Sequence, residues 1–266
     1  MYIFGVLIFV FLCTAGFLAG FIDSVAGGGG LITLPALIAV NLPPHIALGT
    51  NKFQSMFGTT FALANFTRKA KVIWKIAAVG IPFALIGSVA GARLALVIPA
   101  SVLAKIIVVL IPPLALFLFF SPSLCKGGKG RVDREISTSS DSPLQRGRLW
   151  IATPIACLII GTYDGFLGPG TGTFLILALV FFSNISLLHA SATAKTFNLA
   201  SNVGAFVIFL VNGQVYLPYA MAMAGFNILG NIIGSHFAMK HGREFIQKIL
   251  VVSLTLLFIY LIWKYF

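Results

Sequence analysis

The stretch that decides the fold is GFIDSVAGGGGL, residues 20–31, which places an aspartate and four consecutive glycines inside an apolar chain. A related stretch, GTYDGFLGPGTGT at residues 161–173, repeats the aspartate and the glycines in the second half of the sequence. Glycine inside a helix lowers stability by roughly 0.5–1 kcal/mol relative to alanine, because it loses more conformational freedom on folding. Both stretches therefore predict interruptions in apolar helices, with a carboxylate near each interruption.

The composition around these two stretches is that of a membrane protein. Of 266 residues, 59% are hydrophobic and only 9% are charged, whereas about 25% are charged in soluble proteins. Apolar runs such as 2–21, 76–97 and 101–120 approach or exceed the ~20 residues that a membrane-spanning helix needs. We therefore predict an all-α polytopic membrane protein that is embedded in a lipid bilayer.

The net charge of +12 does not indicate a nucleic-acid-binding protein. Basic residues gather in loops and at the ends of apolar segments, which is the pattern of loops that stay in the cytoplasm. Cys13, Cys125 and Cys157 have no paired spacing that would indicate a metal site or a disulfide framework. The zinc-protease motif HExxH, the hydrolase motif GxSxG and the phosphate-binding P-loop are absent. We expect no enzyme activity, no metal and no cofactor.

The chain divides into two halves of five apolar segments each. In the first half these are roughly 2–21, 31–42, 45–66, 74–97 and 100–120, and in the second 149–166, 171–183, 187–211, 215–239 and 243–263. The stretch between the halves is rich in Gly, Ser and basic residues, which predicts a flexible loop. The expected organisation is a first transmembrane repeat at 1–120, a basic loop at 121–148 and a second transmembrane repeat at 149–266.

The two halves are related by an internal duplication. A shift of 141 residues places Gly20, Asp23, Gly27 and Gly29 on Gly161, Asp164, Gly168 and Gly170. After a two-residue insertion, a shift of 143 aligns ALGTNKFQS at 47–55 with ASATAKTFN at 190–198, and Lys52 falls on Lys195. Repeated matches of Gly, Asp and Lys at nearly one shift indicate a duplicated unit.

The distribution of basic residues predicts that the two repeats are inverted. The loop RKAKVIWK at 68–75 carries four basic residues, and its counterpart VNGQVYLP at 211–218 carries none. The central loop carries six Lys or Arg residues, and its counterpart, the C-terminal tail, carries only Lys264. Because basic loops stay in the cytoplasm, opposite biases indicate opposite orientations. We predict a cytoplasmic central loop and both termini outside the inner cell membrane.

Segments 31–42 and 171–183 are too short to span a membrane as straight helices. About 12 helical residues cover only ~18 Å of a ~30 Å hydrocarbon core. Each segment follows a glycine-rich break, and broken backbone is tolerated at membrane depth only inside protein or against a polar cavity. The free N–H groups that begin such a half-helix favour an anion. We predict two inverted repeats of about four membrane helices each, with re-entrant half-helices meeting near the midplane, as in secondary transporters.

Four charged residues, Asp23, Asp164, Lys52 and Lys195, lie in apolar surroundings. Each would cost ~2.5–3.5 kcal/mol at the centre of a membrane helix, so such residues usually serve a function. The aspartates could orient the lysines or carry a coupling proton. The alternatives are structural ion pairs Asp23–Lys52 and Asp164–Lys195, or lysines that extend to the membrane interface.

Candidate substrate-binding residues are the glycines of the two breaks together with the two lysines and the polar residues around them. They are Gly27, Gly28, Gly29, Gly30, Thr50, Asn51, Lys52, Gly168, Gly170, Gly172, Thr193, Lys195, Asn198 and Asn202. For the polar residues, hydrogen bonding between helices is an equally open interpretation.

These motifs resemble those of the sulfite exporter TauE/SafE family, including its YfcA-like probable transporters. The resemblance rests on GFIDSVAGGGGLITLPAL, ALGTNK, GTYDGFLGPGTGTF and SATAKTFNLASN, which occur in order in both halves. It implies an inner-membrane permease, because the better-characterised members of that family are linked to export or uptake of sulfite, sulfonates and related organic anions. Asn51 is replaced by Ala194 in the second half, so one asymmetric site is expected rather than two equal ones.

We therefore expect a secondary transporter for a small anion such as sulfite or a sulfonate. One alternative is a proton- or cation-coupled carrier of another small solute, in which the aspartates bind the ion, and another is a passive channel. An intramembrane enzyme or an assembly partner is a further class, but neither accounts for duplicated charges in apolar segments. The sequence does not specify the oligomeric state.

Overall fold

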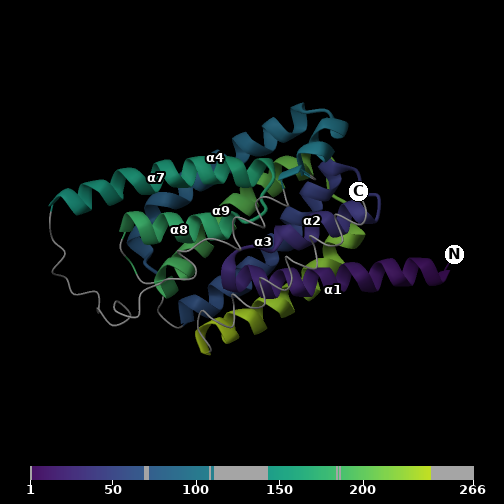
Figure 1. Ribbon diagram of the computed structural model, residues 1–266, viewed down its shortest axis with the longest axis horizontal. Coiled ribbons are helices and arrows are strands. Elements are labelled where there is room, and N and C mark those ends of the chain that lie inside the picture. Colours follow the sequence, from purple (N-terminus) through teal and green to yellow (C-terminus); the bar gives the residue numbers. More distant parts are fainter. Residues whose placement is uncertain are drawn as a thin grey trace.

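A computed structural model of the chain describes residues 2–68, 72–107, 109–110, 143–183, 185 and 187–240. Within these ranges all regular secondary structure is helical and no strand occurs. The helices are α1 (Tyr2–Ala26), α2 (Gly30–Ala39), α3 (Pro44–Arg68), α4 (Trp74–Val97), α7 (Pro143–Phe166), α8 (Thr171–Ser183) and α9 (Leu187–Val211), followed by the Leu217–Lys240 helix (Figure 1). Residues 100–107 are also helical. The expected segment 243–263 and most of the expected central loop lie outside the described residues.

The interruption of the first apolar segment occurs later than the sequence suggested. Helix α1 continues to Ala26 instead of ending near residue 21, so Asp23 lies in the last turn of the helix. The residue that follows the helix is Gly27, which has φ 76° and donates its N–H to the carbonyl of Asp23 at 2.9 Å. A residue with positive φ terminates helices, and glycine adopts that conformation without a steric penalty.

The second half repeats this sequence of helix, break and short helix. Helix α7 ends at Phe166, the break includes Gly168 with φ 92° and Gly170 with φ 78°, and α8 begins at Thr171. Helix α7 begins at Pro143, six residues before the expected segment. The short helices α2 and α8 have 10 and 13 residues, or about 15 and 20 Å at 1.5 Å per residue.

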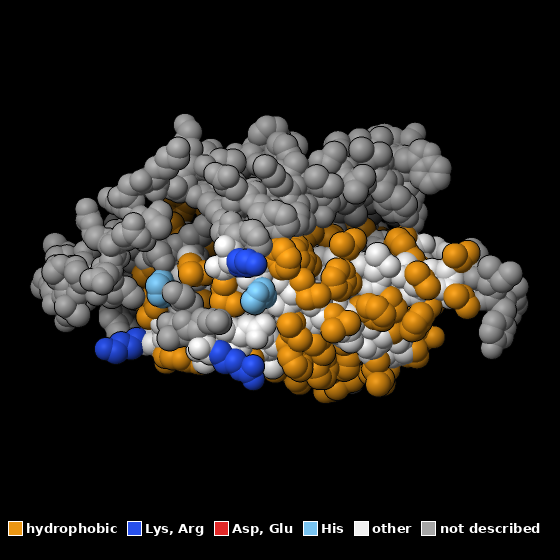
Figure 2. All heavy atoms as spheres, turned by 90° about the horizontal axis from the view of Figure 1, so that it is seen from below, with side chains coloured by type: hydrophobic (Ala, Val, Ile, Leu, Met, Phe, Trp, Pro, Cys, Tyr) orange, Lys and Arg blue, Asp and Glu red, His pale blue; other side chains and the backbone are white. Residues whose placement is uncertain are grey.

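The outer surface is that of a protein surrounded by lipid. Among the described residues, four helices are long and apolar enough to cross a membrane: Gly5–Val25, Trp74–Val97, Leu188–Val211 and Leu217–Lys240. Large apolar side chains such as Leu7, Ile86 and Ile159 are more than half exposed. In Figure 2 hydrophobic side chains are spread over the described part of the face, and the visible Lys and Arg lie in its left half. The chain is a multi-pass membrane protein.

The two halves pack against each other through equivalent contacts. Helix α4 lies along α7 and α9, and α3 packs against α9 (Figure 1). In α4, Gly91 approaches Thr162 of α7, whereas Gly234 approaches Phe21 of α1. Because residues 91 and 234 are 143 apart and residues 21 and 162 are 141 apart, each contact reproduces the other. The first helix of each half therefore packs against the fourth helix of the other half.

The absence of a side chain at Gly91 permits the close approach of α4 to α7. A Cβ at this position would overlap the carbonyl oxygen of Thr162, so we expect Gly91→Ala to destabilise the protein by about 1–3 kcal/mol, as overpacking does. The matched control is Gly225→Ala in the Leu217–Lys240 helix, where no atom lies within 4 Å of the added Cβ. It should stabilise by up to about 1 kcal/mol. Unfolding midpoints in detergent micelles measure both changes, and equal midpoints would contradict the packing.

Candidate functional site

The two glycine-rich breaks lie in direct contact with each other. The N–H of Gly172 in the first turn of α8 donates a 3.1 Å hydrogen bond to the carbonyl oxygen of Gly27. A Cβ on either glycine would overlap the backbone of the other. The sequence predicted that the breaks would meet, and the structure brings them together. It also shows that one of the N–H groups expected to face an anion is bonded to the other half.

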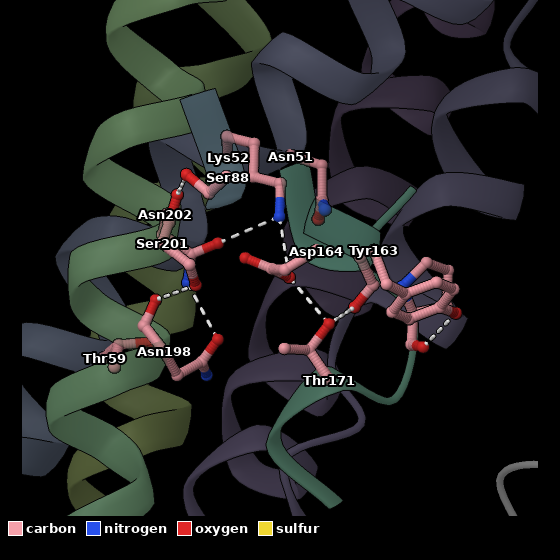
Figure 3. A network of polar contacts seen from close by, with 12 residues as sticks. Asn51, Lys52, Thr59, Ser88, Tyr163, Asp164, Thr171, Asn198, Ser201 and Asn202 are labelled. Carbon is pink, nitrogen blue, oxygen red and sulfur yellow. Dashed lines mark hydrogen bonds and ion pairs between the residues drawn. The ribbon is translucent and has the colours of Figure 1, made fainter. Parts of the chain in front are cut away.

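Lys52 in α3 forms an ion pair with Asp164 in α7, as Figure 3 shows. The Nζ–Oδ1 distance is 2.8 Å, and the two side chains are 1% and 2% exposed. Lys52 Nζ also donates to Asn202 Oδ1 of α9 at 3.3 Å. Asp164 Oδ1 accepts a 2.7 Å hydrogen bond from the Thr171 hydroxyl at the start of α8. The pair thus connects α3, α7, α8 and α9 at one point.

Lys195 in α9 forms the equivalent pair with Asp23 in α1. Its Nζ lies 2.9 Å from Asp23 Oδ2 and also donates to the main-chain oxygen of Asp23. The hydroxyl of Thr59 in α3 donates to Asp23 Oδ2 at 3.4 Å. Thr59 and Asn202 are 143 residues apart, so the repeat provides each ion pair with a corresponding polar neighbour. The lysine also lies at the C-terminal end of α1, where the helix dipole favours a positive charge.

The pairing differs from the structural ion pairs that the sequence left open as an alternative. The alternative pairs, Asp23–Lys52 and Asp164–Lys195, are wrong, because each lysine pairs with the aspartate of the other half. The physical reason is that α3 and α9 pack against each other. Neither lysine extends to the membrane interface, since each residue is 1% exposed. A buried charge needs a partner within a few ångströms to offset its loss of hydration.

Glycines in the two breaks leave space for the charged side chains and for the first turns of the short helices. A Cβ at Gly168 would lie 2.8 Å from Lys52 Nζ. Gly29 accepts the N–H of Thr33 at 3.2 Å in the first turn of α2, and Gly30 lies beside Pro169 of the second break. A Cβ added at Gly28 would meet only apolar side chains, those of Leu31 and Ile22. The absence of a side chain at Gly168 therefore leaves room for the Lys52 ammonium beside the second break.

The remaining polar candidates divide into two groups. Asn202 contacts Lys52, and Asn198 Oδ1 accepts a 3.3 Å hydrogen bond from Asn202. The hydroxyls of Thr50 and Thr193 instead accept the N–H groups of Tyr216 and Ile73, both at 3.0 Å. Those N–H groups immediately precede the Leu217–Lys240 helix and α4. The two threonines thus connect the halves at matched helix starts.

Sequence reasoning missed several buried polar residues near the site. Thr59 and Thr171 contact the two aspartates. Asn227 and Asn231 lie inside the Leu217–Lys240 helix, are 2% and 0% exposed, and bond to each other. The sequence did contain a signal for these two residues, namely two asparagines four residues apart in an apolar segment. Such a pair indicates a buried polar contact, because buried amides require hydrogen-bond partners. Within the described ranges no group of three His, Cys, Asp or Glu could hold a metal ion.

Several features together define a class of protein. Membrane-length apolar helices surround two helix breaks, and duplicated lysine–aspartate pairs lie buried beside those breaks. Ionisable residues inside membrane segments usually mark a path for a solute or an ion. The fold and the site are those of a multi-pass membrane transporter.

Comparison with known proteins identifies the family. The family model described as "Sulfite exporter TauE/SafE" matches residues 12–261. The chain belongs to the sulfite exporter TauE/SafE family. No solved structure matches the chain.

Curated relatives carry the names of transporters. The chain is 38% identical over 245 residues to the probable membrane transporter protein ORF9 of Sinorhizobium sp, covering 91% of this chain and 87% of the relative. It is 36% identical over 252 residues to a probable membrane transporter protein of Haemophilus influenzae, covering 93% and 92%. It is 35% identical over 251 residues to the probable membrane transporter protein YfcA of Escherichia coli, covering 93% and 85%.

Proposed function

We propose that the chain is a secondary transporter for a small anion of the sulfite, sulfonate or related organic-anion class. The observation that carries this proposal is the pair of buried lysines beside two glycine-rich breaks, each neutralised by an aspartate of the other half. An oxyanion offers a lysine the same partner that a carboxylate offers, namely a negatively charged oxygen. The substrate and the two aspartates therefore compete for the same two cations.

Access to the lysines requires a movement of the helices around them. Both residues are 1% exposed, so a solute reaches them only after the two halves separate on one side. Each ion pair connects the two halves, and opening one pair at a time would expose one lysine at a time. We propose that repeats 1–120 and 149–266 are inverted and move against each other, with the 121–148 loop in the cytoplasm and both termini outside the inner membrane.

Asp164 supplies a route for coupling to protons. Its Oδ2 is buried and has no hydrogen-bond partner among the described residues. An anion that binds Lys52 would leave this carboxylate without its cation, and a buried carboxylate without a cation is favoured to take up a proton. The free oxygen gives that proton a position. Inward movement of an anion would then be accompanied by a proton.

Flux into proteoliposomes tests the proposal. We expect labelled sulfite to enter with saturable kinetics, faster when a proton gradient is imposed, and far above the rate in empty liposomes. Lys75→Met is a matched control, because Lys75 is exposed at the start of α4 and its loss should leave the flux unchanged.

Other results would favour other functions. Unsaturable flux without coupling would indicate a channel. Flux of another solute that depends on a cation and is insensitive to added anions would indicate a carrier in which the aspartates bind the cation. No saturable flux for sulfite, sulfonates or carboxylates would overturn the anion proposal.

A further inference from the structure

A chain of buried amide side chains connects the Leu217–Lys240 helix to Asn51, the neighbour of Lys52. Asn231 Nδ2 donates to Asn227 Oδ1 at 2.8 Å, and Asn227 Nδ2 donates to Gln54 Oε1 at 3.0 Å. Gln54 Nε2 then donates to Asn51 Oδ1 at 3.0 Å. All four side chains are 3% exposed or less. We call Asn231, Asn227, Gln54 and Asn51 the amide relay.

Main-chain carbonyls fix the direction of the amide relay. Asn227 Nδ2 also donates to the carbonyl of Gly16 at 3.3 Å, and Asn231 Nδ2 donates to the carbonyl of Asn227 at 3.0 Å. A carbonyl oxygen can only accept a hydrogen bond, so the nitrogen of each asparagine must lie on that side. The orientation of Gln54 follows, because its oxygen must face the nitrogen of Asn227. Its nitrogen therefore faces Asn51.

The relay determines which end of Asn51 faces the helix breaks. Asn51 Oδ1 accepts from Gln54 and from the Thr33 hydroxyl at 2.5 Å. The amide nitrogen is therefore turned away from them, and it lies 3.7 Å from the position that a Cβ of Gly30 would occupy. Pro169 of the other break lies 3.4 Å from that same position. An N–H donor is thus held where the two breaks meet.

Among the described residues, only one half of the protein has this arrangement. The second half has Ala194 at the position that matches Asn51 and Phe197 at the position that matches Gln54. The first half has Ala84 in place of Asn227 and Ser88 in place of Asn231. Alanine and phenylalanine cannot continue a chain of amides. The hydroxyl of Ser88 donates to the carbonyl of Ser201 at 2.6 Å instead. The two halves match in their ion pairs and differ in this hydrogen-bond donor.

We propose that the amide relay holds the Asn51 amide nitrogen as a specificity-determining donor for the substrate. This inference rests on the proposed anion transport. The preferred substrate is an oxyanion with at least two acceptor oxygens, one for the Lys52 ammonium and one for the Asn51 amide. Gln54 and Asn227 are positioning residues, since they act through Asn51. A monatomic anion could use the lysine alone and gains less from the second donor.

The test compares Gln54→Met with Phe197→Met in proteoliposomes, using labelled sulfite. Met at 54 removes the donor that orients Asn51, so we expect KM to rise about tenfold, as for a lost hydrogen bond to a charged group, with kcat changed less than twofold. Phe197 is the matched position in the second half, is 0% exposed, and its replacement by Met should leave KM within twofold of wild type.

Two further variants separate a positioning role from a structural one. Gln54→Glu keeps the relay when the carboxyl is protonated, because it then accepts from Asn227 and donates to Asn51; the ionised form can only accept. Its KM should be near wild type at low pH and rise with pH more steeply than that of wild type. Asn51→Ala introduces the residue found at Ala194. It should raise KM as Gln54→Met does. The Gln54→Met, Asn51→Ala double variant should show no further rise, since both substitutions remove the same interaction with the substrate.

The outcomes distinguish this inference from the proposed function. Suppose that wild type transports sulfite with saturable kinetics and that Gln54→Met leaves KM unchanged. The relay inference is then overturned, and anion transport stands. If Gln54→Met does not fold, Asn51→Ala takes its place in this comparison. An equal KM rise in Phe197→Met would also overturn it, because the effect would then be general repacking. If wild type shows no saturable anion flux, both proposals fall.

Discussion

Replacing Lys52 with methionine is expected to destabilise the folded protein by about 3–5 kcal/mol, the usual effect of removing one partner from a buried ion pair. The large effect arises because Asp164 is 2% exposed and would be left in an apolar interior without the cation that offsets its loss of hydration. Reversible unfolding in mixed micelles measures the change. Lys75→Met, at an exposed lysine, should change stability by less than about 0.5 kcal/mol.

A second substitution identifies the partner of Lys52. Adding Asp164→Asn to Lys52→Met removes the unpaired charge, so most of the lost stability should return. Adding Asp23→Asn should not restore it, because Asp23 pairs with Lys195 and its loss leaves a second charge unpaired. Restoration by Asp23→Asn and not by Asp164→Asn would contradict the crossed pairing.

The Lys52→Met, Asp164→Asn double variant also separates folding from transport. It should be folded and yet have lost saturable anion flux, because neutral residues leave no cation for the substrate at this position. Wild-type flux in this variant would show that the ion pair serves stability alone.

The helices could be predicted from the sequence because membrane helices leave a strong pattern of composition. The expected 74–97 and 187–211 segments coincide with α4 and α9, whose ends are marked by polar or turn-forming residues. The sequence predicted the end of α1 too early, because Ser24, Val25 and Ala26 are compatible both with a helix and with a loop. Only the positive φ of Gly27 sets that boundary, and a run of four glycines does not indicate which one adopts it.

The charged residues of the candidate site were predictable, and their pairing was not. The duplication drew attention to Lys52 and Lys195 because charge is costly in apolar segments. Which aspartate each lysine reaches depends on the packing of α3 against α9, which no local sequence pattern contains. The amide relay was missed for the same reason, since Asn227 is 173 residues from Gln54.

The contact between the two glycine-rich breaks should be disrupted by the addition of a single methyl group. We expect Gly27→Ala to destabilise the protein by about 2–5 kcal/mol. A left-handed conformation costs an alanine roughly 1–2 kcal/mol, and overpacking adds about 1–3 kcal/mol. At Gly27 both apply, because φ is 76° and a Cβ would overlap the backbone of Gly172. The yield of monodisperse protein in size-exclusion chromatography and the unfolding midpoint measure the loss.

Gly28→Ala is the matched control for this prediction. Its added Cβ would lie 3.5 Å from a Leu31 methyl carbon and 3.6 Å from an Ile22 methyl carbon, which are ordinary contacts. We therefore expect Gly28→Ala to fold like wild type. If Gly27→Ala were tolerated as well as Gly28→Ala, the two breaks could not be in backbone contact. Loss of folding in Gly27→Ala alone would instead show that residue 27 cannot carry the methyl group that residue 28 carries, as the positive φ and the contact with Gly172 together predict.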